Sequence, residues 1–160
     1  MRASRGVRVA VPRRVSFDEA RRISLAKLAW IRRSLARVES ARGRCGEAVL
    51  AAGCLDRRAA RSFLAGRLGA LAEEHGYRPG RLSVRHQGTI WGRASRSGRI
   101  QLNAVLAVVP PDLADYVILH ELVHTRVRGH GRAFWAELER SMPDARSRQV
   151  HLRDYALALF

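Results

Sequence analysis

The stretch HELVHTRVRGHGRAFW, residues 120–135, constrains this chain more than any other part of its sequence. It begins with the pattern H-E-x-x-H, in which His120 and His124 are four residues apart. Residues four apart lie on one face of an α-helix, so the two imidazoles can bind a single ion. The surrounding run from Leu113 to Val127 is strongly apolar. The pattern therefore predicts a buried helix that supplies two ligands to a metal ion.

A third histidine, His130, follows six residues after His124. A zinc ion that does chemistry takes three protein ligands and keeps a fourth position open for water. His120, His124 and His130 would supply those three ligands. Glu121 adjoins the first ligand, and its carboxylate can reach the bound water as a general base. The sequence thus indicates a hydrolytic Zn2+ centre, although nickel, cobalt or manganese would also suit three histidines.

Two plainer interpretations stay open for this motif. The histidines could be core residues hydrogen-bonded to the backbone, with Glu121 a surface carboxylate, or His130 could be a solvent-facing loop residue. The spacing of His130 matches H-E-x-x-H-x-x-G-x-x-H, but Val127 stands where that pattern has glycine. Glycines occur instead at Gly129 and Gly131, so the turn that returns His130 is expected to be built around them.

The motif and its flanks resemble the YgjP-like metallopeptidase domain, a zinc peptidase family of the zincin-like fold related to the SprT-like and WLM groups. That family has an aspartate-tyrosine pair before H-E-x-x-H, and a third histidine and a phenylalanine-tryptophan pair after it. The chain has Asp115-Tyr116 and Phe134-Trp135 at these places. Upstream, Trp91, Gly92 and Asn103 match a tryptophan-glycine segment and a strand that ends in asparagine.

The resemblance covers about residues 7–158 and implies an α+β, zincin-like fold, with a small antiparallel sheet packed on helices and a central H-E-x-x-H helix. It implies a zinc-dependent metallopeptidase that acts on a protein or peptide substrate. Zincin-like folds commonly align the peptide along an edge strand above the metal helix, so Ile100–Asn103 and Ile90–Ala94 are candidates for that strand. Ile90, Arg93 and Ala94 stand where the family usually has arginine, serine and cysteine.

Apolar periodicity and turn residues predict the other elements. Alternation in VRVAV predicts a strand over 7–11, and a capping box with Ser16 as N-cap and Glu19 at the third helical position predicts a helix over 17–39. Residues 40–54 are glycine-spaced and indicate a linker that could include a short turn of helix. Residues 55–77 predict a second long helix, from the helical spacing of Phe63, Leu64, Leu68, Leu71 and Ala72. From residue 81 the period becomes two, which predicts a small antiparallel sheet. Two helices are expected after the motif, from Arg132 to Met142 and after Pro143. The buried side of the first helix is expected to include Ile23, Ala26, Trp30 and Leu35.

The chain is strongly basic, with a formal net charge of +16. At 160 residues it is expected to be a single metallopeptidase domain, 1–160, with a basic N-terminal strand and helix over 1–44 and a metal-site core over 55–160. Residues 1–44 carry 12 arginines and Lys27 against three acidic residues. Such a region attracts polyanions, because binding releases counterions from phosphate. An arginine-for-lysine bias of the genome is the competing explanation, and no nucleic-acid-reading motif accompanies the charge.

Three functions fit these observations. The first is a zinc metallopeptidase with Glu121 as general base. The others are a DNA-associated protease that acts on DNA-bound proteins, and a non-catalytic, zinc-containing domain that binds nucleic acid. Asp115 and Asp154 are candidates to orient the histidines through their free ring nitrogens. Tyr116, one turn before His120, is expected to pack rather than to react.

Cys45 and Cys54 are too widely spaced for a zinc knuckle and are expected to be reduced thiols. The N-terminal residues lack the apolar core of a secretory signal, and no stretch is long enough to span a membrane. We therefore expect a cytoplasmic protein without a membrane partner.

Overall fold

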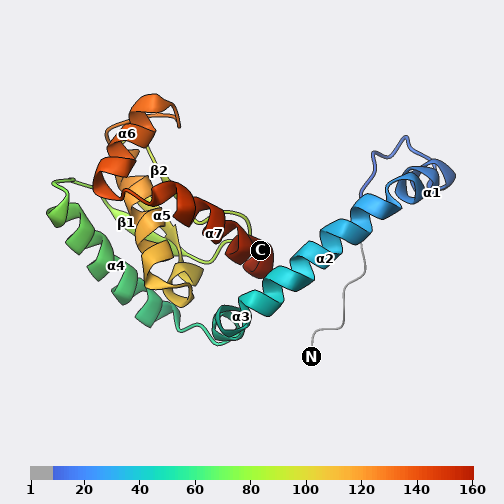
Figure 1. The fold of residues 1–160 in the computed structure, drawn as a ribbon, viewed down its shortest axis with the longest axis horizontal. Coiled ribbons are helices and arrows are strands. Elements are labelled where there is room, and N and C mark those ends of the chain that lie inside the picture. The colour runs from blue at the N-terminus through green and yellow to red at the C-terminus, as the bar shows by residue number, and fades with distance from the viewer. Residues whose placement is uncertain (1–8) are drawn as a thin grey trace. The chain divides into compact units, whose positions relative to one another are not determined.

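The computed structural model describes residues 9–160, which form α-helices and a three-stranded sheet, as an α+β fold requires (Figure 1). The chain divides into two compact units, one that ends at Glu39 and one that spans Ser40–Phe160. Of the strand predicted over 7–11, residues 7 and 8 lie outside the described residues, and 9–11 have no regular structure. Within 9–160, no helix is both long and apolar enough to cross a membrane. The elements are α1 (Phe17–Ala26), α2 (Leu28–Arg44), α3 (Gly46–Gly53), α4 (Arg57–Glu74), β1 (Leu82–Arg85), β2 (Gly92–Ala94), β3 (Ile100–Asn103), the 3-10 helix η1 (Ala104–Val108), α5 (Pro111–Val123), α6 (Arg132–Ser141) and α7 (Ala145–Leu159).

The predicted helix start at Ser16 is confirmed, because its side chain accepts a hydrogen bond from the Glu19 N–H at 3.2 Å. The prediction of one helix over 17–39 is wrong, since α1 stops at Ala26 and α2 begins at Leu28. The Ser24 hydroxyl donates to the Ala20 carbonyl at 2.7 Å, an arrangement that bends helices. Lys27 then shares its N–H between two carbonyls at the break.

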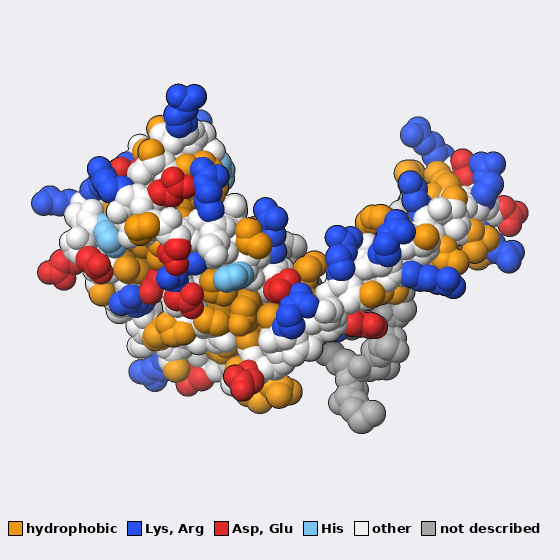
Figure 2. Space-filling view, viewed as in Figure 1, with side chains coloured by type: hydrophobic (Ala, Val, Ile, Leu, Met, Phe, Trp, Pro, Cys, Tyr) orange, Lys and Arg blue, Asp and Glu red, His pale blue; other side chains and the backbone are white. Residues whose placement is uncertain are grey.

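The first unit exposes the side chains that the sequence assigned to its core. Ile23, Trp30 and Leu35 are 48%, 58% and 45% exposed, and Ala26 is also exposed. Figure 2 shows hydrophobic side chains lying between arginines along α1 and α2. The prediction failed because amphipathic spacing shows which residues share a face of a helix, but not whether another layer covers that face.

The second unit begins with small residues that allow close helix packing. Residues 40–54 were predicted to be a linker with room for a short turn of helix, and they instead form the end of α2 and the whole helix α3. Ala41, Cys45 and Ala158 pack in one buried cluster, so α7 supplies the surface that these short side chains need. The next helix, α4, was predicted, and it buries Leu64 and Leu68 as expected, whereas Phe63 is 43% exposed. Cys45 and Cys54 are free thiols, as expected.

The sheet is mixed rather than antiparallel, which corrects the prediction. Its order is β1-β3-β2, with β1 parallel and β2 antiparallel to the central strand β3. The chain therefore crosses from one edge to the other before it returns through the middle. Asn103 holds this crossing, because its buried amide donates to the carbonyls of Gln87 at 2.7 Å and Ile90 at 2.8 Å. Of the two candidate edge segments, Ile100–Asn103 is central, and only Gly92–Ala94 is an edge strand.

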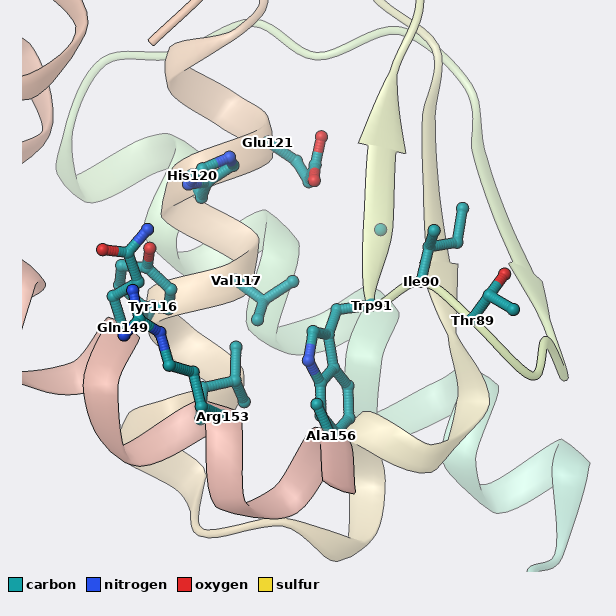
Figure 3. Close-up of a pocket in the computed structure, with 12 residues that line it drawn as sticks. Thr89, Ile90, Trp91, Tyr116, Val117, His120, Glu121, Gln149, Arg153 and Ala156 are labelled. Carbon is teal, nitrogen blue, oxygen red and sulfur yellow. The ribbon is translucent and has the colours of Figure 1, made fainter. Parts of the chain in front are cut away.

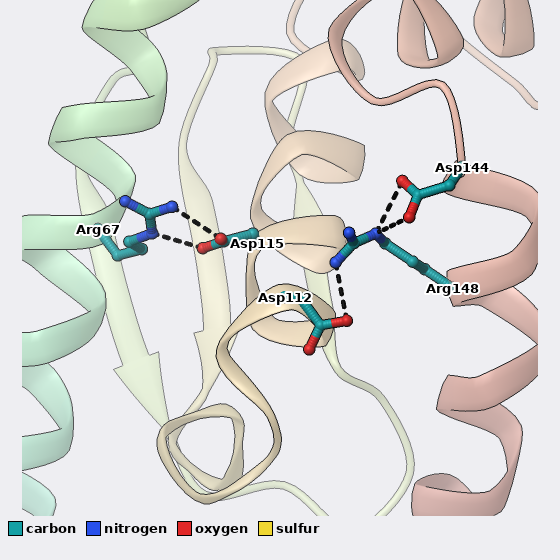
Figure 4. Close-up of polar contacts among 5 residues, drawn as sticks. All are labelled: Arg67, Asp112, Asp115, Asp144 and Arg148. Atoms are coloured by element: carbon teal, nitrogen blue, oxygen red, sulfur yellow. Dashed lines mark hydrogen bonds and ion pairs between the residues drawn. The ribbon is translucent and has the colours of Figure 1, made fainter.

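Helix α5 is the central helix, as the sequence predicts. It is buried nearly all round, and ion pairs fix its first turns to the neighbouring helices (Figure 4). Asp115 accepts two hydrogen bonds from Arg67 of α4, at 2.6 and 2.7 Å. Asp112 pairs with Arg148 of α7 at 2.8 Å, and the same guanidinium contacts Asp144. These contacts orient α5 between α4 and α7.

Candidate metal centre

Three imidazoles meet at the C-terminal end of α5. The Nε2 atoms of His120 and His124 lie 3.2 Å apart, and the Nε2 of His130 lies 3.1 Å from His124 and 3.0 Å from His120. Helix α5 ends at Val123, but His124 keeps helical angles, with φ −64° and ψ −13°, so the four-residue spacing still puts both rings on one face. Zinc–nitrogen bonds of about 2.0–2.1 Å in a tetrahedral site would separate ligand atoms by roughly 3.3–3.4 Å. The three nitrogens are thus within about a few tenths of an ångström of the separation that one tetrahedral ion requires.

A glycine turn returns His130 to the helix. Gly129 has φ +71°, a conformation that favours glycine, so the turn predicted around this residue is confirmed. Gly131 has an ordinary φ of −75° and serves as the N-cap of α6. The His130 side chain is exposed, yet its ring lies against the other two. His130 therefore closes the outer side of the triad.

The ring nitrogens of His124 have distinct roles. Its Nδ1 lies 3.1 Å from the carbonyl of Val127, an acceptor that holds the ring proton at Nδ1 and leaves Nε2 with a free lone pair. The predicted orienting carboxylates are elsewhere, because Asp115 pairs with Arg67 and Asp154 pairs with Arg44. Asp115 and Asp154 were therefore wrong candidates for this role. A charged partner for each was not apparent from sequence spacing.

Burial keeps two of the imidazoles neutral. It lowers the pKa of His120 to about 3, with a further contribution from the neighbouring histidines, and it also lowers the pKa of His124. Phe134 of α6 is fully buried beneath the triad, and its ring centroid lies 4.5–4.8 Å from all three imidazole centroids. Two neutral nitrogen donors therefore lie against a buried aromatic ring, an arrangement that suits a metal ion.

Glu121 is buried, with only 6% of its surface exposed. Its Oε2 has no hydrogen-bond partner within residues 9–160, and its side chain extends from α5 toward β2 (Figure 3). Burial raises the pKa of its carboxyl to about 7, against the opposing effect of a backbone hydrogen bond from Ala94. The alternative of a surface carboxylate is therefore wrong. A buried acid with one unpartnered oxygen next to His120 is well suited to exchange protons.

Gly92 of β2 makes room for Glu121. A methyl group at this position would lie 3.0 Å from Glu121 Cγ, 3.1 Å from Glu121 Oε1 and 3.2 Å from the carbonyl oxygen of Gln101. The edge strand can pass this close to the carboxylate only because the residue has no side chain. Gly92 is one of the residues that match the family pattern in the sequence analysis. The reason that glycine is needed there becomes clear only from the packing of β2 on α5.

Gly92→Ala is expected to lower the peptidase activity that the sequence predicts by about tenfold, with unchanged metal content, because the methyl group must displace Glu121 or the β3 backbone by a few tenths of an ångström. Turnover of an unfolded protein substrate and elemental analysis would measure both effects. Gly88→Ala is the matched control, since a methyl group there meets nothing within 4 Å. Equal activity in the two variants would show that Glu121 does not need this clearance.

A cavity of about 380 Å³ opens beside His120 and Glu121 (Figure 3). Val117 of α5 and Leu152 of α7 give it apolar walls, and Trp91 lies on the side of β2. Tyr116 lines the same cavity and is otherwise buried, so it packs as expected and also borders the site. Gln149 and Arg153 of α7 bring polar groups to the cavity, and sequence reasoning missed both because they lie far from the motif. The cavity can hold a substrate side chain next to the triad.

The donor set fits a catalytic rather than a closed metal site. Among the His, Cys, Asp and Glu side chains of residues 9–160, the only group able to hold a metal is His120, His124 and His130. Structural zinc sites usually have four protein ligands, whereas catalytic sites have three and an open position. The histidines thus leave a position beside the cavity for water or substrate.

Comparisons with known proteins identify a family and a similar fold. The family model described as YgjP-like, metallopeptidase domain, matches residues 51–155. Among solved structures, the chain is similar to the crystal structure of the metallopeptidase zymogen of Pyrococcus abyssi abylysin, with 24% identity and a TM-score of 0.50. The match covers 56% of this chain and 90% of that chain, and it supports the zincin-like α+β fold. No curated protein matches the sequence.

Proposed function

Because this chain belongs to the YgjP-like metallopeptidase family, we propose that it is a zinc-dependent peptidase whose metal ligands are His120, His124 and His130. The observation that carries the proposal is the triangle of Nε2 atoms, 3.0–3.2 Å apart, on the same helix end as a buried glutamate. Three imidazole donors suit Zn2+, and the same donors would accept Ni2+ or Co2+.

Glu121 is the general base of this proposal. A bound zinc ion would lower the pKa of the attacking water and would polarise the scissile carbonyl. Glu121 takes the proton from that water and later returns it to the leaving amine. The open edge of β2 pairs with the substrate backbone, and the cavity between β2, α5 and α7 holds one substrate side chain. Burial of Glu121 excludes competing water from the carboxylate.

The non-catalytic zinc domain is the weaker alternative. A structural role would be better served by a fourth protein ligand, which residues 9–160 do not offer at the triad. It also gives no reason to bury Glu121 without a hydrogen-bond partner for its Oε2. The DNA-associated protease makes a different demand, since it needs a nucleic-acid-binding surface on the same chain.

Metal removal tests the proposed function directly. The purified chain is expected to contain about one zinc ion and to hydrolyse an unfolded, fluorescently quenched protein. Dialysis against a chelator should lower the rate by at least roughly 100-fold, and equimolar Zn2+ should restore it. Full activity in metal-free protein would contradict the proposal, and so would a zinc-loaded protein that cleaves no peptide bond in any unfolded substrate.

A further inference from the structure

A second hollow, of about 700 Å³, lies over the sheet and is lined by five arginines. Strand β1 contributes Arg85 and β2 contributes Arg93, while Arg81 and Arg99 precede β1 and β3, and Arg61 comes from α4. Residues alternate between the two faces of a strand, so Arg93 and its partner Gln101 stand opposite the buried Ile100 and Leu102. The hollow is therefore a feature of the face that the core does not use.

Within the described residues, these arginines have no paired carboxylate. All five are exposed, no acidic residue lines the hollow, and none of the five forms an ion pair within residues 9–160. All 14 Asp and Glu of the chain lie within those residues. In contrast, Arg67 and Arg148 of the same unit each pair with a carboxylate. Like charges gathered without partners repel one another, which an anionic ligand would relieve.

The sequence shows the same concentration of charge. Residues 75–111, which contain the whole sheet, carry six arginines and no acidic residue. Residues 45–74 carry four arginines and four acids, and residues 112–160 carry seven of each. A compositional preference for arginine would put arginine in place of lysine throughout the chain. It would not remove acidic residues from one segment alone. The charge of this segment is therefore a local property of the sheet.

We propose that this hollow binds the sugar-phosphate backbone of a nucleic acid. Guanidinium groups bind phosphate through two parallel hydrogen bonds, and hydroxyls such as those of Ser83 and Ser97 can donate to phosphate oxygens. A nucleic acid presents one negative charge at every residue, whereas a protein rarely places carboxylates so regularly. No aromatic side chain of the described part of the chain, residues 9–160, lines the hollow, so bases have no stacking surface there and binding is independent of sequence.

The position of Arg93 links this hollow to the candidate metal centre. Arg93 follows Gly92 on β2, and Gly92 lies against Glu121. If β2 aligns peptide substrates, which rests on the proposed function, a nucleic acid in the hollow lies along the same strand as the peptide. Proteins attached to nucleic acid would then be the favoured substrates. The binding itself does not depend on peptidase activity and can be measured without it.

Fluorescence anisotropy with a labelled single-stranded DNA of 20 thymidines tests the proposal on the full chain. The variant Arg81→Gln, Arg85→Gln, Arg93→Gln, Arg99→Gln removes four charges from the hollow. Its matched control, Arg21→Gln, Arg22→Gln, Arg32→Gln, Arg33→Gln, removes four charges from α1 and α2. The hollow variant should bind at least about tenfold more weakly, and its plot of log affinity against log salt should be shallower by about 3. The control should change affinity less than about threefold at the same salt concentration.

Thermal melting and zinc content, unchanged in both variants, would show that the fold and the triad are intact. Equal weakening of the two variants would overturn the proposal, because binding would then follow net charge. Polyglutamate of equal charge that binds as tightly as the DNA and responds to the hollow variant in the same way would also overturn it, in favour of an acidic protein ligand. Anisotropy with RNA and with duplex DNA of the same length then shows which kind of nucleic acid binds most tightly.

Discussion

Glu121→Gln is expected to lower peptide hydrolysis by roughly 10²–10⁴-fold while the protein keeps its metal. The amide has the shape of the carboxylate but cannot accept a proton from the attacking water. Residue 121 is not one of the three proposed metal ligands, His120, His124 and His130, so the metal content should not change. The folded state should not lose stability, because the change replaces a buried acid, whose Oε2 has no hydrogen-bond partner within residues 9–160, by a neutral group of the same size.

Initial rates with an unfolded protein substrate, beside elemental analysis and a thermal melt, measure these effects. Glu73→Gln is the matched control, since Glu73 is exposed on α4 and forms no ion pair within residues 9–160. Retention of activity in Glu121→Gln would remove Glu121 from the mechanism. Loss of the metal together with activity would instead assign Glu121 as a ligand.

His124→Ala is expected to remove the metal almost completely. Its Nε2 lies within 3.2 Å of both other Nε2 atoms, and its ring stacks on Phe134 at 4.5 Å. Substitution of a residue that only hydrogen-bonds to a metal ligand typically lowers metal affinity by roughly 10–100-fold. Loss of the His124 ligand itself should therefore lower it by more. His130→Ala should also lower affinity substantially, although its exposed ring contributes less to the packing of the triad.

Competition with a chromophoric chelator measures the affinities of both variants. His86→Ala provides the control, because His86 is exposed and lies outside the triad. Full metal content in His130→Ala would exclude His130 as a ligand and would leave two histidines and an unidentified third group. Peptidase activity in either variant at wild-type level would contradict the three-histidine centre.

Short-range features of this protein could be predicted from its sequence. The spacing of His120 and His124 places both rings on one helix face wherever α5 lies in the fold, and that follows from helix geometry alone. The turn at Gly129 and the helix start at Ser16 are also local, because a positive φ and a side-chain cap involve only neighbouring residues. The apolar spacing of α4 likewise predicted its buried face.

The long-range features required the tertiary structure. Sequence periodicity does not say which strand is central, so the order β1-β3-β2 and the edge position of β2 were not predictable. That order brings Gly92 against Glu121 and buries the carboxylate, and α7 separately brings Gln149 and Arg153 to the cavity. Sequence periodicity also did not predict the arginine partners of Asp115 and Asp154. Nor did it predict that the apolar face of α1 and α2 is exposed, because that depends on which elements pack together. Local backbone geometry determined the spacing of the ligands, whereas burial and ion pairing depended on residues far apart in the chain.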